Sequence, residues 1–245
     1  MDLYKSGFSG FDGERLIKAR RYAQACQDSR MSEMVKVGGA EKPRDEVLEY
    51  AADYLRGIGR YAYPAYDAYP GTDSDQVGDA DLLAICLLTA GQKPIPIYYG
   101  LQSRIPDMNE VLARLPKDEP FAEASLETLE TITDFFGILG AKPTTQVGKT
   151  KLLKVLHRKR PELIPLFDEN IRRCYSLIGA APVPPIGSRT HRDFAIAWLP
   201  ELQRDVVQQM SVWQEIVAMA DPAVSITPLR ALDIVGWDLG TPRRQ

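Results

Sequence analysis

Apolar residues recur at helical spacing along most of the chain. Residues 44–58 place one stripe of apolar side chains at intervals of three and four: Val47, Leu48, Ala51, Tyr54, Leu55 and Ile58. The same spacing predicts helices over 14–27, 121–139 and 168–177, with Gly179 ending the last of them. Two or three more helices are expected in the last 55 residues. No segment alternates with the two-residue period of a strand, so we expect an all-α protein.

Two segments depart from this pattern. Residues 79–91, DADLLAICLLTAG, are apolar on nearly every side after an acidic start, which predicts a capped helix buried at the centre of a helical domain. Residues 61–71, YAYPAYDAYPG, combine prolines with four tyrosines and predict an ordered, aromatic-lined loop. Gly38–Gly39 and the proline-rich APVPPIGS mark breaks. We therefore expect three parts: 1–78 with N-terminal helices and the aromatic loop, 79–180, and 181–245 with C-terminal helices that pack with the N-terminal part.

The composition adds little chemistry of its own. The formal net charge is −3, and no apolar run approaches the ~20 residues of a membrane span. The N-terminus lacks a basic start followed by an apolar block, so no secretory signal is expected. Cys26, Cys86 and Cys174 lie far apart, which fits a reducing cytoplasm. His157 and His191 have no carboxylate four residues on, so we expect no metal site. The short apolar runs lead us to expect no membrane partner.

The stretch TTQVGKTKLLK, residues 144–154, contains the Gly-Lys-Thr of a phosphate-binding P-loop. A P-loop needs a glycine five residues before its Gly-Lys, and here that position is Pro143. The residues before it also have helical spacing, where a P-loop follows a buried strand. A short turn between two helices, the second opening with lysines, instead indicates a helix-hairpin-helix that presents backbone N–H groups to a nucleic-acid phosphate.

The charge around this stretch supports a nucleic-acid partner. Between Lys149 and Arg173 lie eight basic residues against three acidic ones, in a chain that is acidic overall. A solvated basic face without a partner is the alternative interpretation. The expected DNA contacts are Gln146, Gly148, Lys149, Thr150, Lys151, Lys154 and Arg172.

Three blocks carry a resemblance to a known family: DADLLAICLLTAG, QVGKTKLLKVL and IPLFDENIRRCYSLIG. In this order they resemble the first core helix, the hairpin and the following segment of the helix-hairpin-helix (HhH-GPD) base-excision DNA glycosylases, which include endonuclease III and the adenine glycosylase MutY. The block KLLKVLHRKRPELIPLFD, with LRALDIVGW, also looks like a bacterial family of hypothetical proteins. The resemblance implies a glycosylase-like fold: a helix-hairpin-helix core over 79–180 and two helical subdomains with a cleft between them.

The resemblance also implies site residues. The carboxylate it makes catalytic is Asp168, twenty residues after Gly148 and at a predicted helix N-cap. An ionised carboxylate stabilises the oxocarbenium-like sugar formed when a glycosidic bond breaks, although Asp168 as a helix cap alone is the competing interpretation. Thr150 stands where related enzymes carry a Schiff-base lysine, so we expect a monofunctional enzyme that leaves an abasic site. Gln146 replaces the first glycine of the hairpin turn, which leaves Gly148 alone to make it.

A base can be reached only outside the duplex stack, so a pocket and a gap-filling residue are expected. The pocket candidates are Tyr63, Tyr66, Asp67 and Tyr69, with ordinary loop packing as the alternative. The gap-filling candidate is Gln92, with a plain turn residue as the alternative. The tryptophans on apolar helical stripes are expected in the core: Trp198, Trp213 and Trp237.

The expected partner is therefore double-stranded DNA with one base flipped out, bound by a monomer. No cofactor is expected, apart from a monovalent cation at the hairpin. A non-catalytic helix-hairpin-helix DNA-binding protein is the alternative from another functional class. The base that is excised stays open, as does the choice between repair and defence against modified foreign DNA.

Overall fold

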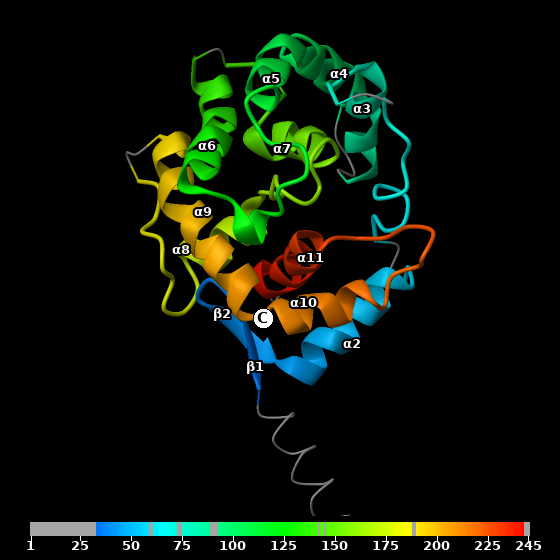
Figure 1. Cartoon of the computed structure of the whole chain (residues 1–245), viewed down its shortest axis with the longest axis vertical. Coiled ribbons are helices and arrows are strands. Elements are labelled where there is room, and N and C mark those ends of the chain that lie inside the picture. Colours follow the sequence, from blue (N-terminus) through cyan, green and yellow to red (C-terminus); the bar gives the residue numbers. More distant parts are fainter. Residues whose placement is uncertain are drawn as a thin grey trace, which may run out of the picture.

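The computed structural model describes residues 33–58, 61–72, 75–88, 93–141, 143–144, 146–187 and 190–242. The predicted helix over 14–27 and the gap-filling candidate Gln92 lie outside these ranges. Helices dominate the described chain, which confirms the helical class (Figure 1). The elements are β1 (Met34–Val37), β2 (Ala40–Pro43), α2 (Arg44–Leu55), α3 (Asp79–Leu83), η1 (Ala84–Leu87), α4 (Pro94–Gln102), α5 (Ile105–Leu112), η2 (Phe121–Glu123), α6 (Leu126–Ala141), α7 (Lys149–His157), α8 (Glu169–Ser176), α9 (His191–Gln208), α10 (Met210–Val217) and α11 (Pro228–Gly240).

The short antiparallel hairpin β1–β2 corrects the expectation of a purely helical chain. Val37 pairs with Ala40 across a turn in which Gly38 has a φ of +60°, a conformation that favours glycine. The amide of Gly39 donates to the carbonyl of Cys174 in α8 at 2.8 Å. Exposed and buried residues do alternate along β1, but four residues are too few to establish a period in the sequence.

Two predicted helices are shorter than expected. Helix α2 ends before Gly57, which has a φ of +72°, and Ile58 is 54% exposed, so Ile58 does not join the buried stripe. In its described part, 79–88, the helix predicted over 79–91 divides into α3 and the 3-10 helix η1, with Leu83 49% exposed. The prediction of one continuous buried helix there was wrong. The sequence pattern also missed α4 and α5.

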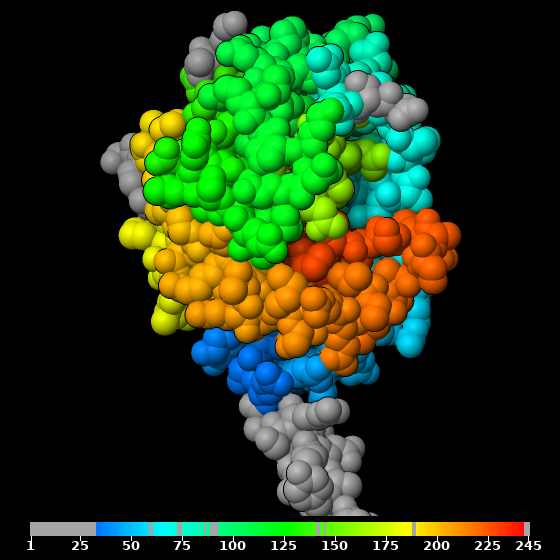
Figure 2. Space-filling model, viewed as in Figure 1, coloured from blue at the N-terminus to red at the C-terminus, as the bar shows by residue number. Residues whose placement is uncertain are grey.

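The helices form two halves that meet along α9 (Figure 1). The first, which we call the α6 half, contains α3 to α7; the second, the α11 half, contains β1, β2, α2, α10 and α11. Helix α11 packs against α2, α8, α10 and both strands, while α9 packs against α6 on one side and α10 and α11 on the other. In the space-filling view the green residues of the α6 half lie directly against the orange C-terminal helices (Figure 2).

Aromatic rings fill the core along α9. Trp198 is fully buried, with the ring of Phe167 at 5.0 Å and that of Phe136 at 5.9 Å between centroids. Trp213 is also fully buried. These positions confirm two of the three tryptophans predicted in the core. Trp237 is 40% exposed, so its assignment to the core was wrong.

Candidate functional site

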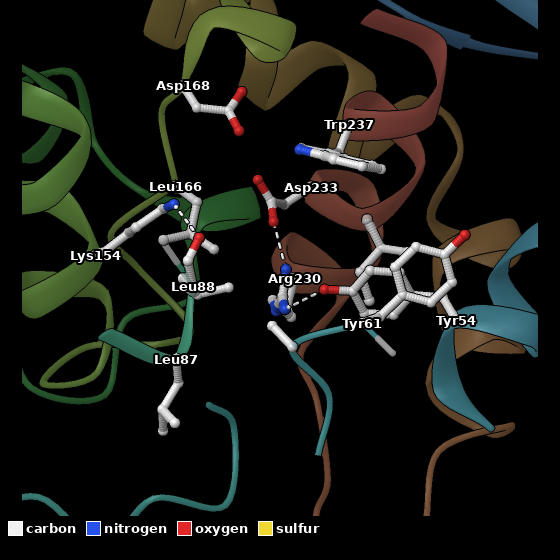
Figure 3. Close-up of a pocket in the computed structure, with 12 residues that line it drawn as sticks. Tyr54, Tyr61, Leu87, Leu88, Lys154, Leu166, Asp168, Arg230, Asp233 and Trp237 are labelled. Atoms are coloured by element: carbon white, nitrogen blue, oxygen red, sulfur yellow. Dashed lines mark hydrogen bonds and ion pairs between the residues drawn. The ribbon is translucent and has the colours of Figure 1, made fainter. Parts of the chain in front are cut away.

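A cavity of about 360 Å³ lies where the two halves meet. Helices α2 and α11 and the start of the aromatic loop form one wall, and η1, α7 and the segment before α8 form the other. Leu87, Leu88 and Leu166 make the second wall largely apolar. Four charged side chains also line the space: Lys154, Asp168, Arg230 and Asp233 (Figure 3). Small-molecule sites have volumes of about 300–1,000 Å³ and combine apolar walls with a few placed polar groups, so this cavity is the candidate site.

Asp168 lies in the cavity wall at the N-cap of α8. Its backbone is extended, and one carboxylate oxygen accepts a hydrogen bond from the amide of Ile171 at 3.0 Å. The predicted capping role is thereby confirmed. Within the described parts of the chain only this amide donates to the carboxylate, and the side chain faces the cavity (Figure 3). Capping and contact with a ligand are therefore compatible, and the helix N-terminus stabilises negative charge there.

Asp233 of α11 is a second carboxylate in the same cavity, and the sequence analysis missed it. Its Oδ2 accepts a hydrogen bond from Nη1 of Arg230 at 2.5 Å. Arg230 is only 3% exposed, and its Nε also donates to Asp67 at 2.9 Å. Burial raises the pKa of Asp233 to about 6; the Arg230 charge opposes this rise and the negative charge of Asp168 adds to it.

Lys154 supplies an amine to the cavity and corrects its predicted role as a DNA contact. The residue is 9% exposed, and its Nζ donates to the carbonyl of Leu88 at 3.4 Å. Burial lowers the pKa of this amine, and the nearby carboxylates of Asp168 and Asp233 oppose that effect. Residues 152–157 of α7 are all buried, so the Lys154 amine faces the cavity and not the outer surface where a DNA phosphate would lie.

Aromatic rings form the third component of the cavity. The rings of Tyr54 and Tyr61 stack with their centroids 4.6 Å apart, and Trp237 meets Tyr61 edge-on at 6.4 Å. The indole of Trp237, which is 40% exposed, lines the cavity beside the two carboxylates (Figure 3). This wall suits a planar ligand, since aromatic rings stack on planar groups.

The four predicted pocket residues do not line this cavity. The hydroxyl of Tyr63 donates to the carbonyl of Val224 at 3.0 Å, and the hydroxyl of Tyr66 donates to the carbonyl of Lys154 at 2.7 Å. Asp67 binds Arg230, and the carbonyl of Tyr69 accepts a hydrogen bond from Arg158. The aromatic loop therefore packs inward and supports Lys154 and Arg230 from behind, as the alternative of ordinary loop packing implied.

Helices α6 and α7 are joined by a short turn at the predicted hairpin. Gln146 has a φ of +65°, whereas Gly148 is extended at −103° and caps α7. The prediction that Gly148 alone makes the turn was therefore wrong: the left-handed residue is Gln146, where the resemblance has a glycine. The Nζ of Lys151 donates to the Gln146 carbonyl at 2.8 Å. Lys149 is half-buried, and burial lowers its pKa to about 8. Thr150, beside it, is partly exposed.

Most of the basic residues that follow are held inside the protein, which corrects the expectation of a strongly basic surface. Arg158 donates to the carbonyls of Tyr66 and Tyr69, and Lys159 forms a buried ion pair with Asp81 at 2.7 Å. Outside the core, Arg172 donates to Glu169 at 2.7 Å. Among the predicted DNA contacts, the turn residues stay accessible to a phosphate: Gln146, Gly148, Lys149 and Lys151.

The fold and the cavity define a mostly helical protein with two carboxyl groups, an amine, a guanidinium and an indole around one pocket. Over the described residues no helix is long and apolar enough to cross a membrane, and no group of three or more His, Cys, Asp or Glu is arranged to hold a metal ion. Residues 47–240 match the model of a family of unknown function, DUF6308, and the chain belongs to this family. Every residue that lines the cavity lies within the matched range. Comparison with curated proteins and with solved structures gives no match.

Proposed function

We propose that this protein is a monofunctional DNA glycosylase that hydrolyses the N-glycosidic bond of a damaged or modified base flipped out of DNA. One observation carries the proposal: Asp168, the carboxylate that the sequence resemblance makes catalytic, lines a cavity that also offers an indole face. In the sequence, Asp168 was singled out by the resemblance, by its spacing from the helix-hairpin-helix turn and by its predicted N-cap position. The cavity is therefore independent support for that assignment.

Asp168 acts on the sugar. As the bond between C1′ and the base nitrogen breaks, positive charge develops on the deoxyribose, and the ionised carboxylate stabilises it. The same carboxylate orients a water molecule and accepts its proton as the oxygen bonds to C1′. The products are the free base and an abasic site.

The cavity and the hairpin divide the remaining tasks. Trp237, which lines the cavity and is 40% exposed, stacks on the flipped base, since enzymes of this kind hold such a base between aromatic or apolar groups. The turn at Gln146 and Gly148, followed by the N-terminus of α7, presents backbone N–H groups and Lys149 to a DNA phosphate. We infer few phosphate contacts, because most of the nearby basic side chains are bound internally.

The test is base release from duplexes that carry a panel of damaged or modified bases, scored as free base and as alkali-labile sites. We expect Asp168→Asn to lower release at least about 100-fold, the scale of electrostatic transition-state stabilisation. Asparagine caps a helix as well as aspartate does, so the fold should persist. Glu169→Gln is the matched control, because it removes a carboxylate from the same helix end at an exposed position.

The other outcomes separate the alternatives. Release of no base from any duplex, with DNA binding retained, would favour the non-catalytic helix-hairpin-helix DNA-binding protein. A covalent complex trapped with borohydride, and lost in Lys154→Met, would contradict the monofunctional mechanism. Lys154 lies one helical turn beyond Thr150 and is the amine that lines the cavity.

A further inference from the structure

We infer that Asp233 is a second catalytic carboxyl group, which protonates the departing base, and that the cavity consequently accepts neutral bases, whose departure requires this proton. This inference rests on the proposed glycosylase function and assigns the residue and the substrate class that go with it.

The geometry places Asp233 opposite Asp168. It reaches the cavity from α11, whereas Asp168 comes from the segment before α8, so a ligand between them would have one carboxyl group on each side. One oxygen of Asp233 binds Arg230, and the other points toward the space between Asp168 and Trp237 (Figure 3). A base stacked on Trp237 would present its edge to that oxygen, while its sugar would lie toward Asp168.

The charges around Asp233 favour one bound proton. Arg230 lies on the same helix, Asp67 comes from the aromatic loop, Lys154 from α7 and Asp168 from the segment before α8. The hydroxyl of Tyr54, from α2, accepts from Nη2 of Arg230 at 3.1 Å and carries no charge. Three carboxylates thus face two cations, and a single proton makes the group neutral. Burial penalises an unbalanced charge, and it is Asp233 whose pKa is raised, to about 6.

The chemistry explains why such an acid is needed. When the glycosidic bond breaks, both bonding electrons move to the base nitrogen, and a neutral base would leave as an anion. The Asp233 hydroxyl gives its proton to a nitrogen or carbonyl oxygen of the base, and the resulting carboxylate is stabilised by Arg230. Water then bonds to C1′ and gives a proton to Asp168. A base made cationic by alkylation leaves neutral without this acid.

The experiment compares single-turnover release of a neutral base, taken from the panel above, with release of 7-methylguanine, a cationic base. Asp233→Asn should lower neutral-base release at least about 100-fold, since general acids contribute about 10²–10⁴-fold. Any 7-methylguanine release should be much less affected. Asp238→Asn, on the same helix but paired with Lys42 outside the cavity, is the matched control.

The pH profile gives a second measurement that needs no variant. Wild-type release of the neutral base should fall tenfold per unit as the pH rises above about 6, because Asp233 loses its proton, and Asp233→Asn should lose this limb. A wild-type profile without the limb would overturn the inference, as would equal losses for both bases or a wild type that releases only 7-methylguanine. Each of these outcomes leaves the glycosylase function intact. No release of any base by the wild type contradicts the proposed function itself.

Discussion

Arg230 joins Asp67 and Asp233 through buried ion pairs beside the cavity, so its replacement by methionine should be one of the most destabilising single changes in the chain. The guanidinium is 3% exposed and binds the carboxylates of Asp67, at 2.9 Å, and Asp233, at 2.5 Å. Methionine fills a similar volume but leaves both carboxylates without their cation. Removing one partner of a buried ion pair costs about 3–5 kcal/mol.

We therefore expect Arg230→Met to lower the free energy of unfolding by about 3–5 kcal/mol. For a chain of this size that corresponds to a fall in Tm of roughly 10 °C, at about 2–4 °C per kcal/mol. The assay is urea unfolding followed by circular dichroism, with the loss read from the midpoint at constant slope. The double variant Asp67→Asn/Arg230→Met removes one of the two stranded carboxylate charges along with the cation and should recover at least half of the loss.

The pH dependence has a definite sign. In Arg230→Met the pKa of Asp233, already raised by burial, rises further above its value in the unfolded chain. The folded variant then binds more protons than the unfolded one, so its stability increases as the pH falls. The deficit relative to wild type should shrink between pH 7.5 and pH 5. A loss below about 1 kcal/mol, or an equal loss with and without Asp67→Asn, would refute the ion-pair account.

Two further predictions concern stability. His157 is buried, with its Nδ1 2.7 Å from the carbonyl oxygen of Ile164, and burial lowers its pKa to about 4. In the unfolded chain the pKa of histidine is about 6.5. The contribution of neutral His157 to stability is therefore complete above pH 6.5 and is lost as the pH falls toward 4. The stability advantage of wild type over His157→Gln should therefore be smaller at pH 5 than at pH 7.5, and an unchanged advantage would contradict it. Gly179 has a φ of +55° and a Cβ there would lie 2.2 Å from the carbonyl oxygen of Gly39, so Gly179→Ala should cost more than about 2 kcal/mol. Gly148 is extended and has open space where a Cβ would lie, so Gly148→Ala should change the free energy of unfolding by less than about 1 kcal/mol. Equal losses for Gly148→Ala and Gly179→Ala in urea unfolding would contradict this reasoning.

The sequence predicted long helices well because their signal is local. Helix α9 carries its apolar stripe and its capping box between Thr190 and Asp193 within a few residues, and α8 shows its cap at Asp168 and a glycine after its end. The sequence did not predict the hairpin β1–β2, because each strand has only four residues and so shows no clear two-residue period. The strands pack against α9 and α11, and the turn between them bonds to Cys174 in α8, so the hairpin depends on residues far along the chain.

The cavity was predicted only in part, because which helices face each other is a long-range property. Asp168 was identified through its spacing from the hairpin, but Asp233 and Trp237 lie on a helix that only the fold brings beside it. A local signal did exist: LRALDIVGW places Arg230 and Asp233 three residues apart among apolar residues, as buried paired charges require. Lys154 was misassigned because a lysine-rich short helix is typical of a surface, whereas α7 lies in the core.

The tip of the β1–β2 hairpin affects the position of a cavity residue through helix α8. The amide of Gly39 donates to the carbonyl of Cys174 in α8. A Cβ on Gly39 would lie 2.1 Å from the carbonyl oxygen of Ile178, so the backbone of the tip lies in close contact with the C-terminal end of α8 and the residues that follow it. The N-terminal end of this same helix positions Asp168. A random-mutagenesis screen for loss of the proposed base release should therefore recover substitutions at Gly39, outside the cavity, alongside those in its lining. A side chain at Gly39 would displace α8 as a unit and move Asp168, at its N-cap, out of position.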